Sequence, residues 1–249
     1  HNKLADFVKP GISTLEIDQF GEKAIRDLGC VPNFLNYNGY PASICVSVND
    51  EVVHGIPSKD RILQDGIIES TLTDLGMDTK NTDAIRSAIT ISGVVPDDTI
   101  DELTAYKSIF ESTNSVDAAQ KLMDVTKQSF FEGIKLAVPG NHLFDISEAI
   151  QKYVESNGYS VVRDLVGHGI GTHLHEDPQI PNFKQRRKGM KLRPGMTLAI
   201  EPMVNEGSYD VVWLDDDWTV VTEDGSLAAH YENTIVITED GCEILTLSE

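Results

Sequence analysis

Hydrophobic and polar residues alternate with a helical period near the start of the chain and with a strand period after it. A first helix is expected to end at 7–11, and Ser13-Thr14-Leu15-Glu16 is typical of the start of a second helix that runs to about Leu28. Two short strands joined by a turn are then expected at 44–48 and 51–54. The first part of the chain therefore predicts two helices followed by a hairpin.

The same order of elements returns later in the chain. Apolar positions at 118–135 have helical spacing, and 145–156 is predicted to be another helix, capped by Asp145 or Ser147. Strands are expected at about 161–164, 197–203, 218–221 and 233–238.

A helix, a Pro-Gly turn and a second helix thus occur twice, around Pro10-Gly11 and around Pro139-Gly140. This repetition favours a duplicated α+β unit. Its expected form is a curved antiparallel sheet with helices on one face.

Length and composition are those of a soluble globular protein. The chain has 249 residues, of which 40% are hydrophobic, and no apolar run approaches the roughly 18–20 residues of a membrane span. No secretory signal is visible at its start. The cysteines are odd in number and form no C-x-x-C pair: Cys30, Cys45 and Cys242. These features predict a reducing, cytoplasmic location.

The formal net charge of −20 bears on possible partners. Nucleic acids and anionic membranes attract basic surfaces, so neither is an expected partner. The acidic runs at 97–98 and 215–217 are interpreted as solvated surface.

The strongest chemical signal lies between Gly167 and Pro178. Three histidines fall within eight residues there, at His168, His173 and His175, among three glycines that let the backbone lie close to whatever binds. Histidine is a common metal ligand and titrates near neutral pH. A glycine-rich loop with surface histidines is the plainer alternative.

Two glutamates accompany apolar strands. Glu201 lies within the run 198–204, and Glu232 precedes the run 233–237. A carboxylate in such a setting is costly to desolvate unless a cation pairs with it. Either glutamate alone would be read as a surface residue, but the two together, after a histidine-rich loop, favour a metal site.

Three further residues carry weaker signals. His54 stands just before a Gly-Ile-Pro turn, where a plain surface histidine is the simpler reading. Asp74 and Asp83 could complete a dinuclear site rich in carboxylates. Turn or surface positions are the simpler reading for both aspartates.

Together these motifs resemble those of the type I methionine aminopeptidases. The shared motifs are Gly-His-Gly-Ile-Gly at 167–171 with a second histidine at His175, Ile-Glu-Pro-Met at 200–203, Tyr-Glu-Asn-Thr at 231–234, the stretch from Tyr37 to Cys45, and His-Gly-Ile-Pro at 54–57. The resemblance covers roughly residues 1–66 and 118–249. It implies the pita-bread α+β fold with internal pseudo-twofold symmetry, in one catalytic domain with halves at about 1–117 and 118–249.

The resemblance also implies the residues of the site. The implied metal ligands are Asp74, Asp83, His168, Glu201 and Glu232. They would hold two divalent ions, of cobalt, manganese, iron or zinc. The implied catalytic residues are His54, His175 and Glu201. The implied substrate-binding residues are Tyr37, Tyr40, Cys45, His54, His175 and Trp218, with Leu174 where a bulkier apolar residue is common.

Residues 67–117 depart from the family pattern. Leu72 occupies the usual position of the first aspartate, and Asp74, two residues later, would face the same side of a strand. Asp83 keeps the family's distance from His54.

Two alternatives remain for this stretch. Asp101 could be the second ligand in place of Asp83, or the metal site could be damaged. The charged residues near 93–115 are expected to form a surface insertion, with a helix at about 99–112.

The function implied by the resemblance is metal-dependent removal of N-terminal methionine from peptides and nascent chains whose second residue is small. The protein is expected to be a monomer. The alternatives are an Xaa-Pro-type aminopeptidase on the same fold and a non-catalytic relative that has lost its metals.

Overall fold

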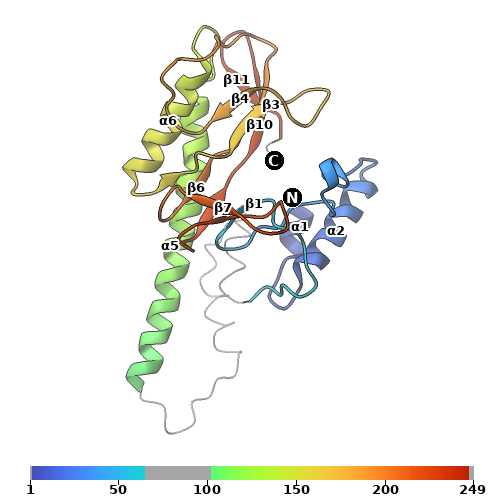
Figure 1. Ribbon diagram of the computed structural model, residues 1–249, viewed down its shortest axis with the longest axis vertical. Helices are drawn as coiled ribbons and strands as arrows, with labels where there is room; N and C mark the ends of the chain where they lie inside the picture. The colour runs from blue at the N-terminus through green and yellow to red at the C-terminus, as the bar shows by residue number, and fades with distance from the viewer. Residues whose placement is uncertain (1, 65–101, 247–249) are drawn as a thin grey trace.

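The computed structural model describes residues 2–64 and 102–246 (Figure 1). Its helices are α1 (Asn2–Phe7), α2 (Thr14–Asp27), α5 (Glu102–Ile134) and α6 (Leu143–Ser156), with a 3-10 turn η1 at Tyr37–Gly39. Its strands are β1 (Glu51–Val53), β2 (Ser160–Val161), β3 (Val166–Gly169), β4 (Glu176–Pro181), β5 (Thr197–Ile200), β6 (Met203–Asn205), β7 (Val211–Trp213), β8 (Val220–Thr222), β9 (Ala228–His230), β10 (Asn233–Ile237) and β11 (Cys242–Ile244). Within these ranges, no helix combines the length and apolar character that a bilayer crossing requires.

Helix α2 begins where the sequence predicts. The Ser13 hydroxyl accepts from the Glu16 amide at 3.2 Å, and the Glu16 carboxylate accepts from the Ser13 amide at 2.8 Å. This reciprocal capping box satisfies backbone donors that the first turn of a helix leaves without partners. The start of the second predicted helix and its end near Leu28 are confirmed.

One continuous helix replaces two predicted ones. Separate helices were expected at about 99–112 and at 118–135, but α5 runs from Glu102 to Ile134 without interruption. No glycine or proline lies between Glu102 and Glu132, so nothing there breaks the ladder of helical hydrogen bonds. The first turns of α5 extend beyond the sheets (Figure 1).

The strand expected at 44–48 is not formed, whereas the one expected at 51–54 is confirmed as β1. The Val46 amide donates to Gly55 O at 2.9 Å, but the amides of Ser43 and Ile44 both donate to the Asp18 carboxylate at 2.9 Å. A side chain of α2 thus accepts the hydrogen bonds from the first backbone amides of this segment, which a neighbouring strand would otherwise accept. Residue alternation cannot reveal such a partner.

The predicted cap of α6 is wrong by a few residues. His142 is the N-cap, Asp145 lies in the first turn, and Ser147 is buried within the helix. The Asp145 carboxylate accepts from the His142 amide at 2.8 Å. An acidic side chain at the third helical position can accept a hydrogen bond from the backbone amide of the N-cap residue. The helix therefore begins before Asp145.

The two Pro-Gly turns occupy equivalent places. The Gly11 amide donates to Leu63 O at 2.9 Å, and the Gly140 amide donates to Leu192 O at 3.1 Å. The two glycines are separated by 129 residues (140 − 11), and so are the two leucines (192 − 63). The first residues of α2 and α6 are also 129 residues apart, as are their last residues. Both glycines have positive φ, at 87° and 91°, which favours glycine. The same helix–turn–helix unit therefore occurs twice in the fold.

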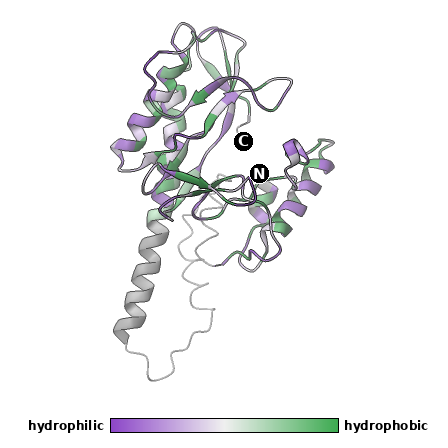
Figure 2. Ribbon diagram, in the orientation of Figure 1, coloured by the Kyte–Doolittle hydropathy of each residue, from purple (hydrophilic) through white to green (hydrophobic). Residues whose placement is uncertain are grey.

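The β-structure of the described part is divided among three antiparallel sheets, with strand orders β1-β8-β7, β11-β10-β5-β3-β4 and β2-β6-β9. Helices α5 and α6 pack on one face of the five-stranded sheet (Figure 1). On β5, Leu198 and Ile200 are buried in this core with Phe130 of α5 and Ile146 of α6. Figure 2 shows hydrophilic positions on the side of α6 that is turned away from the sheets. Alternate residues of β5 consequently face away from the helices.

The capping box of α2 gives a stability prediction. Ser13→Ala removes the hydroxyl that accepts from the Glu16 amide, and it should lower the free energy of unfolding by about 1 kcal/mol in urea titrations. Ser156→Ala, at the exposed end of α6, is the matched control and should change it by less than about 0.5 kcal/mol. Equal effects of the two substitutions would contradict the role of the box.

Candidate metal centre

Strand pairing places three predicted ligands on one face of the five-stranded sheet. His168 on β3 pairs with Ala199 on β5, which in turn pairs with Thr234 on β10. Glu201 is two residues beyond Ala199, and Glu232 is two residues before Thr234. Because side chains alternate with a period of two, all three face the side away from α5 and α6.

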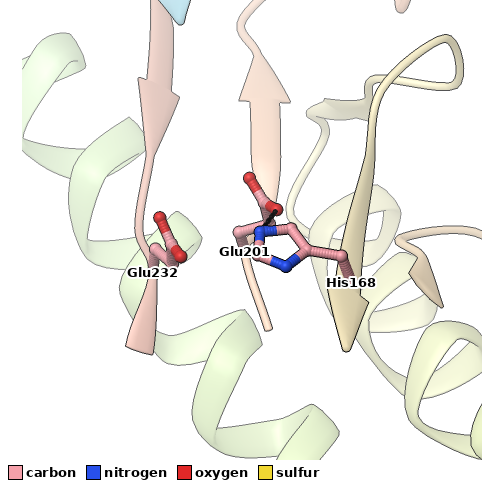
Figure 3. Close-up of side chains that lie close together, drawn as sticks. All are labelled: His168, Glu201 and Glu232. Atoms are coloured by element: carbon pink, nitrogen blue, oxygen red, sulfur yellow. Dashed lines mark ion pairs between the residues drawn. The ribbon is translucent and has the colours of Figure 1, made fainter. Parts of the chain in front are cut away.

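The three side chains converge (Figure 3). One ligand atom from each of His168, Glu201 and Glu232 lies within 4.8 Å of the others. His168 Nε2 is 3.5 Å from Glu201 Oε1. Two ligands at about 2.0–2.2 Å from one ion lie about 3.0–3.5 Å apart at ordinary coordination angles. The spacing therefore suits a shared cation.

Glycines beside His168 let neighbouring strands approach. A Cβ on Gly167 would lie 2.5 Å from Ala199 O, and one on Gly169 would lie 2.2 Å from Asp177 O. Both distances are too short for a side chain. The approaching backbone belongs to β5 on one side and to the β4 region on the other.

The electrostatics of the cluster favour a bound cation. Burial raises the pKa of Glu232, and the neighbouring Glu201 carboxylate raises it further, while His230 and His168 lower it. Glu232 as a residue is solvent-exposed at the pocket, although other protein groups crowd its carboxylate. Two carboxylates and an imidazole in this position are a donor set that suits a divalent transition metal.

The backbone fixes which nitrogen of His168 can bind metal. His168 Nδ1 lies 2.9 Å from Gly169 O. A carbonyl only accepts, so Nδ1 carries the proton and Nε2 keeps its lone pair toward Glu201. Metal-binding histidines are commonly oriented in this way.

His175 stands beside the cluster. Its ring centroid is 4.2 Å from that of His168, and its Nδ1 is 2.7 Å from the Tyr37 hydroxyl oxygen. Burial and then the charge of His168 lower the pKa of His175. The imidazole is therefore neutral at neutral pH, as a hydrogen-bonding partner for a substrate requires.

His54 approaches the pocket in an unusual backbone conformation. Its φ is +60°, in the left-handed region that a histidine rarely adopts. Tyr40 donates to Gly55 O at 2.9 Å, which fixes the backbone next to it. Burial first, and His230 second, lower the pKa of His54. Such local strain is typical of functional sites.

The pocket has a volume of about 300 Å³. The residues that define its chemistry are Phe34, Cys45, His54, His168, Leu174, His175, Glu201, His230 and Glu232. Burial raises the pKa of the Cys45 thiol to about 11, so this side chain is a neutral, weakly polar part of the lining.

Three predicted pocket residues lie behind the lining. Tyr37 contacts His175, as described above. Tyr40 is fully buried, and its ring packs edge-on against Trp218 at 5.0 Å. Trp218 also packs against His54, with centroids 5.9 Å apart. These aromatic rings contact two of the pocket histidines, His54 and His175.

The aspartates of the predicted ligand set, Asp74 and Asp83, lie outside the described residues, as does the alternative Asp101. Among the residues that define the chemistry of the pocket, sequence reasoning missed Phe34 and His230. His230 is two residues before Glu232, and this proximity was the only signal for it. Phe34 gave no signal in the sequence.

Removal of one carboxylate tests the cluster. Glu232→Gln removes a charge that Glu201 repels, so the protein without added metal should melt at the same or a higher temperature than wild type. The rise in melting temperature on adding Mn²⁺ or Co²⁺ should be lost. Calorimetry measures both, with exposed Glu223→Gln as the control that keeps the metal-dependent rise. A full rise in Glu232→Gln would show that Glu232 binds no cation.

Comparisons with known proteins identify the family of the chain. The sequence profile of metallopeptidase family M24 matches residues 1–239. A methionine aminopeptidase of Clostridium acetobutylicum is 48% identical over 100% of this chain and 90% of its own. Methionine aminopeptidase 1 of Bacillus subtilis is 47% identical over 99% and 90%, and the Escherichia coli K12 methionine aminopeptidase is 39% identical over 98% and 84%.

Solved structures give the same result. The methionine aminopeptidase of Thermotoga maritima superposes with a TM-score of 0.77 at 35% identity, covering 99% of this chain and 90% of that one. A prolidase of Pyrococcus furiosus has a TM-score of 0.57 at 14% identity, and it shares the fold alone. The fold is the predicted pita-bread fold, and the chain belongs to metallopeptidase family M24.

Proposed function

We propose that this metallopeptidase removes the N-terminal methionine of peptides and nascent chains whose second residue is small. The observation that carries the proposal is that candidate metal ligands and apolar side chains line one pocket. His168, Glu201 and Glu232 converge in a pocket of about 300 Å³ that Cys45 and Phe34 also line. The names of the relatives that match over nearly the full length of the chain support it.

The pocket suits the side chain of methionine. An unbranched thioether is flexible and polarizable and fills an apolar space that contains a thiol and an aromatic ring. Leu174 contributes a further apolar wall beside His175.

The chain's own residues perform the remaining chemistry. Divalent cations bound at the cluster would activate a water molecule and polarise the scissile carbonyl. Glu201 takes the proton of the attacking water and passes it to the leaving amine. His175, held by Tyr37, and His54 hydrogen-bond the scissile amide and the oxyanion, because both are neutral and face the pocket.

The proposal extends to features that the described residues do not test. The site would hold two ions, of Co, Mn, Fe or Zn, with Asp74 and Asp83 completing the ligands. The chain would form one catalytic domain of two halves, at about 1–117 and 118–249. It would act as a monomer in the cytoplasm.

An assay on short peptides tests the activity. Metal-loaded protein should release methionine from Met-Ala-Ser, and a chelator should abolish the release until metal is restored. The measurement is chromatography of free methionine, with an Xaa-Pro peptide as the competing substrate. Cleavage of the Xaa-Pro peptide without cleavage of Met-Ala-Ser would favour the alternative aminopeptidase.

Two substitutions should inactivate the enzyme for different reasons. His175→Ala removes substrate contacts but no metal ligand, so activity should fall by about 100-fold or more while metal content stays near wild type. Glu201→Gln alters a ligand and the proton carrier, so both activity and metal content should fall. Metal analysis of the purified variants separates the two cases, and equal metal loss in both would show that these roles are wrongly assigned.

A further inference from the structure

A fourth histidine of the pocket, His230, has no role in the chemistry above. It ends β9, where it pairs with Met203 of β6. Met203 is two residues after Glu201, so the same pairing brings His230 next to the Glu201 carboxylate. The Tyr231 amide donates to Pro202 O at 3.1 Å and continues this pairing toward Glu232.

The two oxygens of Glu201 face different histidines. Oε1 is 3.5 Å from His168 Nε2, and Oε2 is 3.4 Å from His230 Nε2. The His230 Nε2 atom is buried, so water does not compete for this contact. Direct N–H···O hydrogen bonds measure about 2.7–3.2 Å, so a small turn of the carboxylate completes this one.

The last torsion of a glutamate is the softest part of its side chain, because it has broad, roughly twofold minima. A carboxylate that binds metal through one oxygen therefore needs a second contact to hold its orientation. Ligating carboxylates are commonly hydrogen-bonded in this way. His168, Glu201 and Glu232 form the tight ligand cluster in the described part of the chain, and His230 stands outside it, on the far oxygen of Glu201.

We propose that His230 is a positioning residue for the metal site: its Nε2–H holds Oε2 of Glu201, so that Oε1 stays directed at the ion shared with His168. This inference rests on the proposed metallopeptidase function. It assigns His230 no bond to metal and no contact with substrate. The hydrogen bond also keeps Glu201 in one orientation for proton transfer, so it should act on the rate more than on substrate binding.

Two substitutions test separately the hydrogen-bond donor of His230 and the size of its side chain. His230→Gln keeps an N–H donor at similar reach, whereas His230→Met keeps similar length without a donor. His173→Ala, in an exposed loop, is the matched control. The probe is Co²⁺ alone, whose visible absorption reports ligand geometry. Titration gives its affinity, and Met-Ala-Ser kinetics give kcat and KM.

The expected results differ between the variants. His230→Met should weaken Co²⁺ binding by about 10–100-fold, alter the absorption band and lower kcat by a similar factor with little change in KM. His230→Gln should restore affinity, spectrum and kcat to within about threefold of wild type, and His173→Ala should match wild type.

Two results would overturn the proposal. If His230→Gln is as impaired as His230→Met in affinity and spectrum, His230 is itself a ligand, because an amide replaces a donor but not an imidazole ligand. If His230→Met binds Co²⁺ and turns over as wild type does, the contact has no positioning role. Should wild type bind Co²⁺ without cleaving Met-Ala-Ser, the proposed function fails, and the affinity and spectra still decide the role of His230.

Discussion

The site depends on two carboxylates that share one face of adjacent strands. Glu201 follows β5 and Glu232 precedes β10, so the pairing that builds the sheet also sets two negative charges beside each other. The result is visible in the raised pKa of Glu232, to which burial and Glu201 both contribute. A sheet of this design is costly unless a positive charge joins the two acids. A bound cation would therefore relieve the local repulsion as well as supply the proposed chemistry.

Because side chains alternate along a strand, the two faces of the sheet carry different sets of residues. Leu198 and Ile200 pack beneath α5 and α6, and the intervening positions of β5 lead to Glu201 on the opposite face. A register slip of one residue would exchange the two sets, burying a carboxylate under the helices and exposing two core residues. The apolar core thus fixes the register that aligns the ligands. Gly167 and Gly169 contribute by letting β3 lie close enough to its neighbours for His168 to reach Glu201.

Much of this arrangement could be predicted from the sequence, and there are physical reasons why the rest could not. The capping box at Ser13 and the duplicated Pro-Gly turns rest on local patterns. The grouping of His168 with two glutamates was implied by the family resemblance of the motifs around them. The conformation of the segment at 44–48 was not predicted because its hydrogen-bond partner is the Asp18 side chain, far away in the sequence. The start of α6 was predicted too late in the sequence because Asp145, which accepts from the His142 amide, lies inside the helix and not at its cap. The orientation of His54 depends on a positive φ, which residue type does not encode for histidine.

The pocket joins parts of the chain that cannot form it separately. Phe34, Cys45 and His54 come from the segment after α2, while His168, His175 and Glu201 come from the later sheet. Contacts between the two groups are direct, as in the 2.7 Å approach of Tyr37 to His175 and the packing of Trp218 on His54. The two groups are therefore coupled through the aromatic contacts at their boundary, and a change in the packing of Trp218 or Tyr37 would act on both.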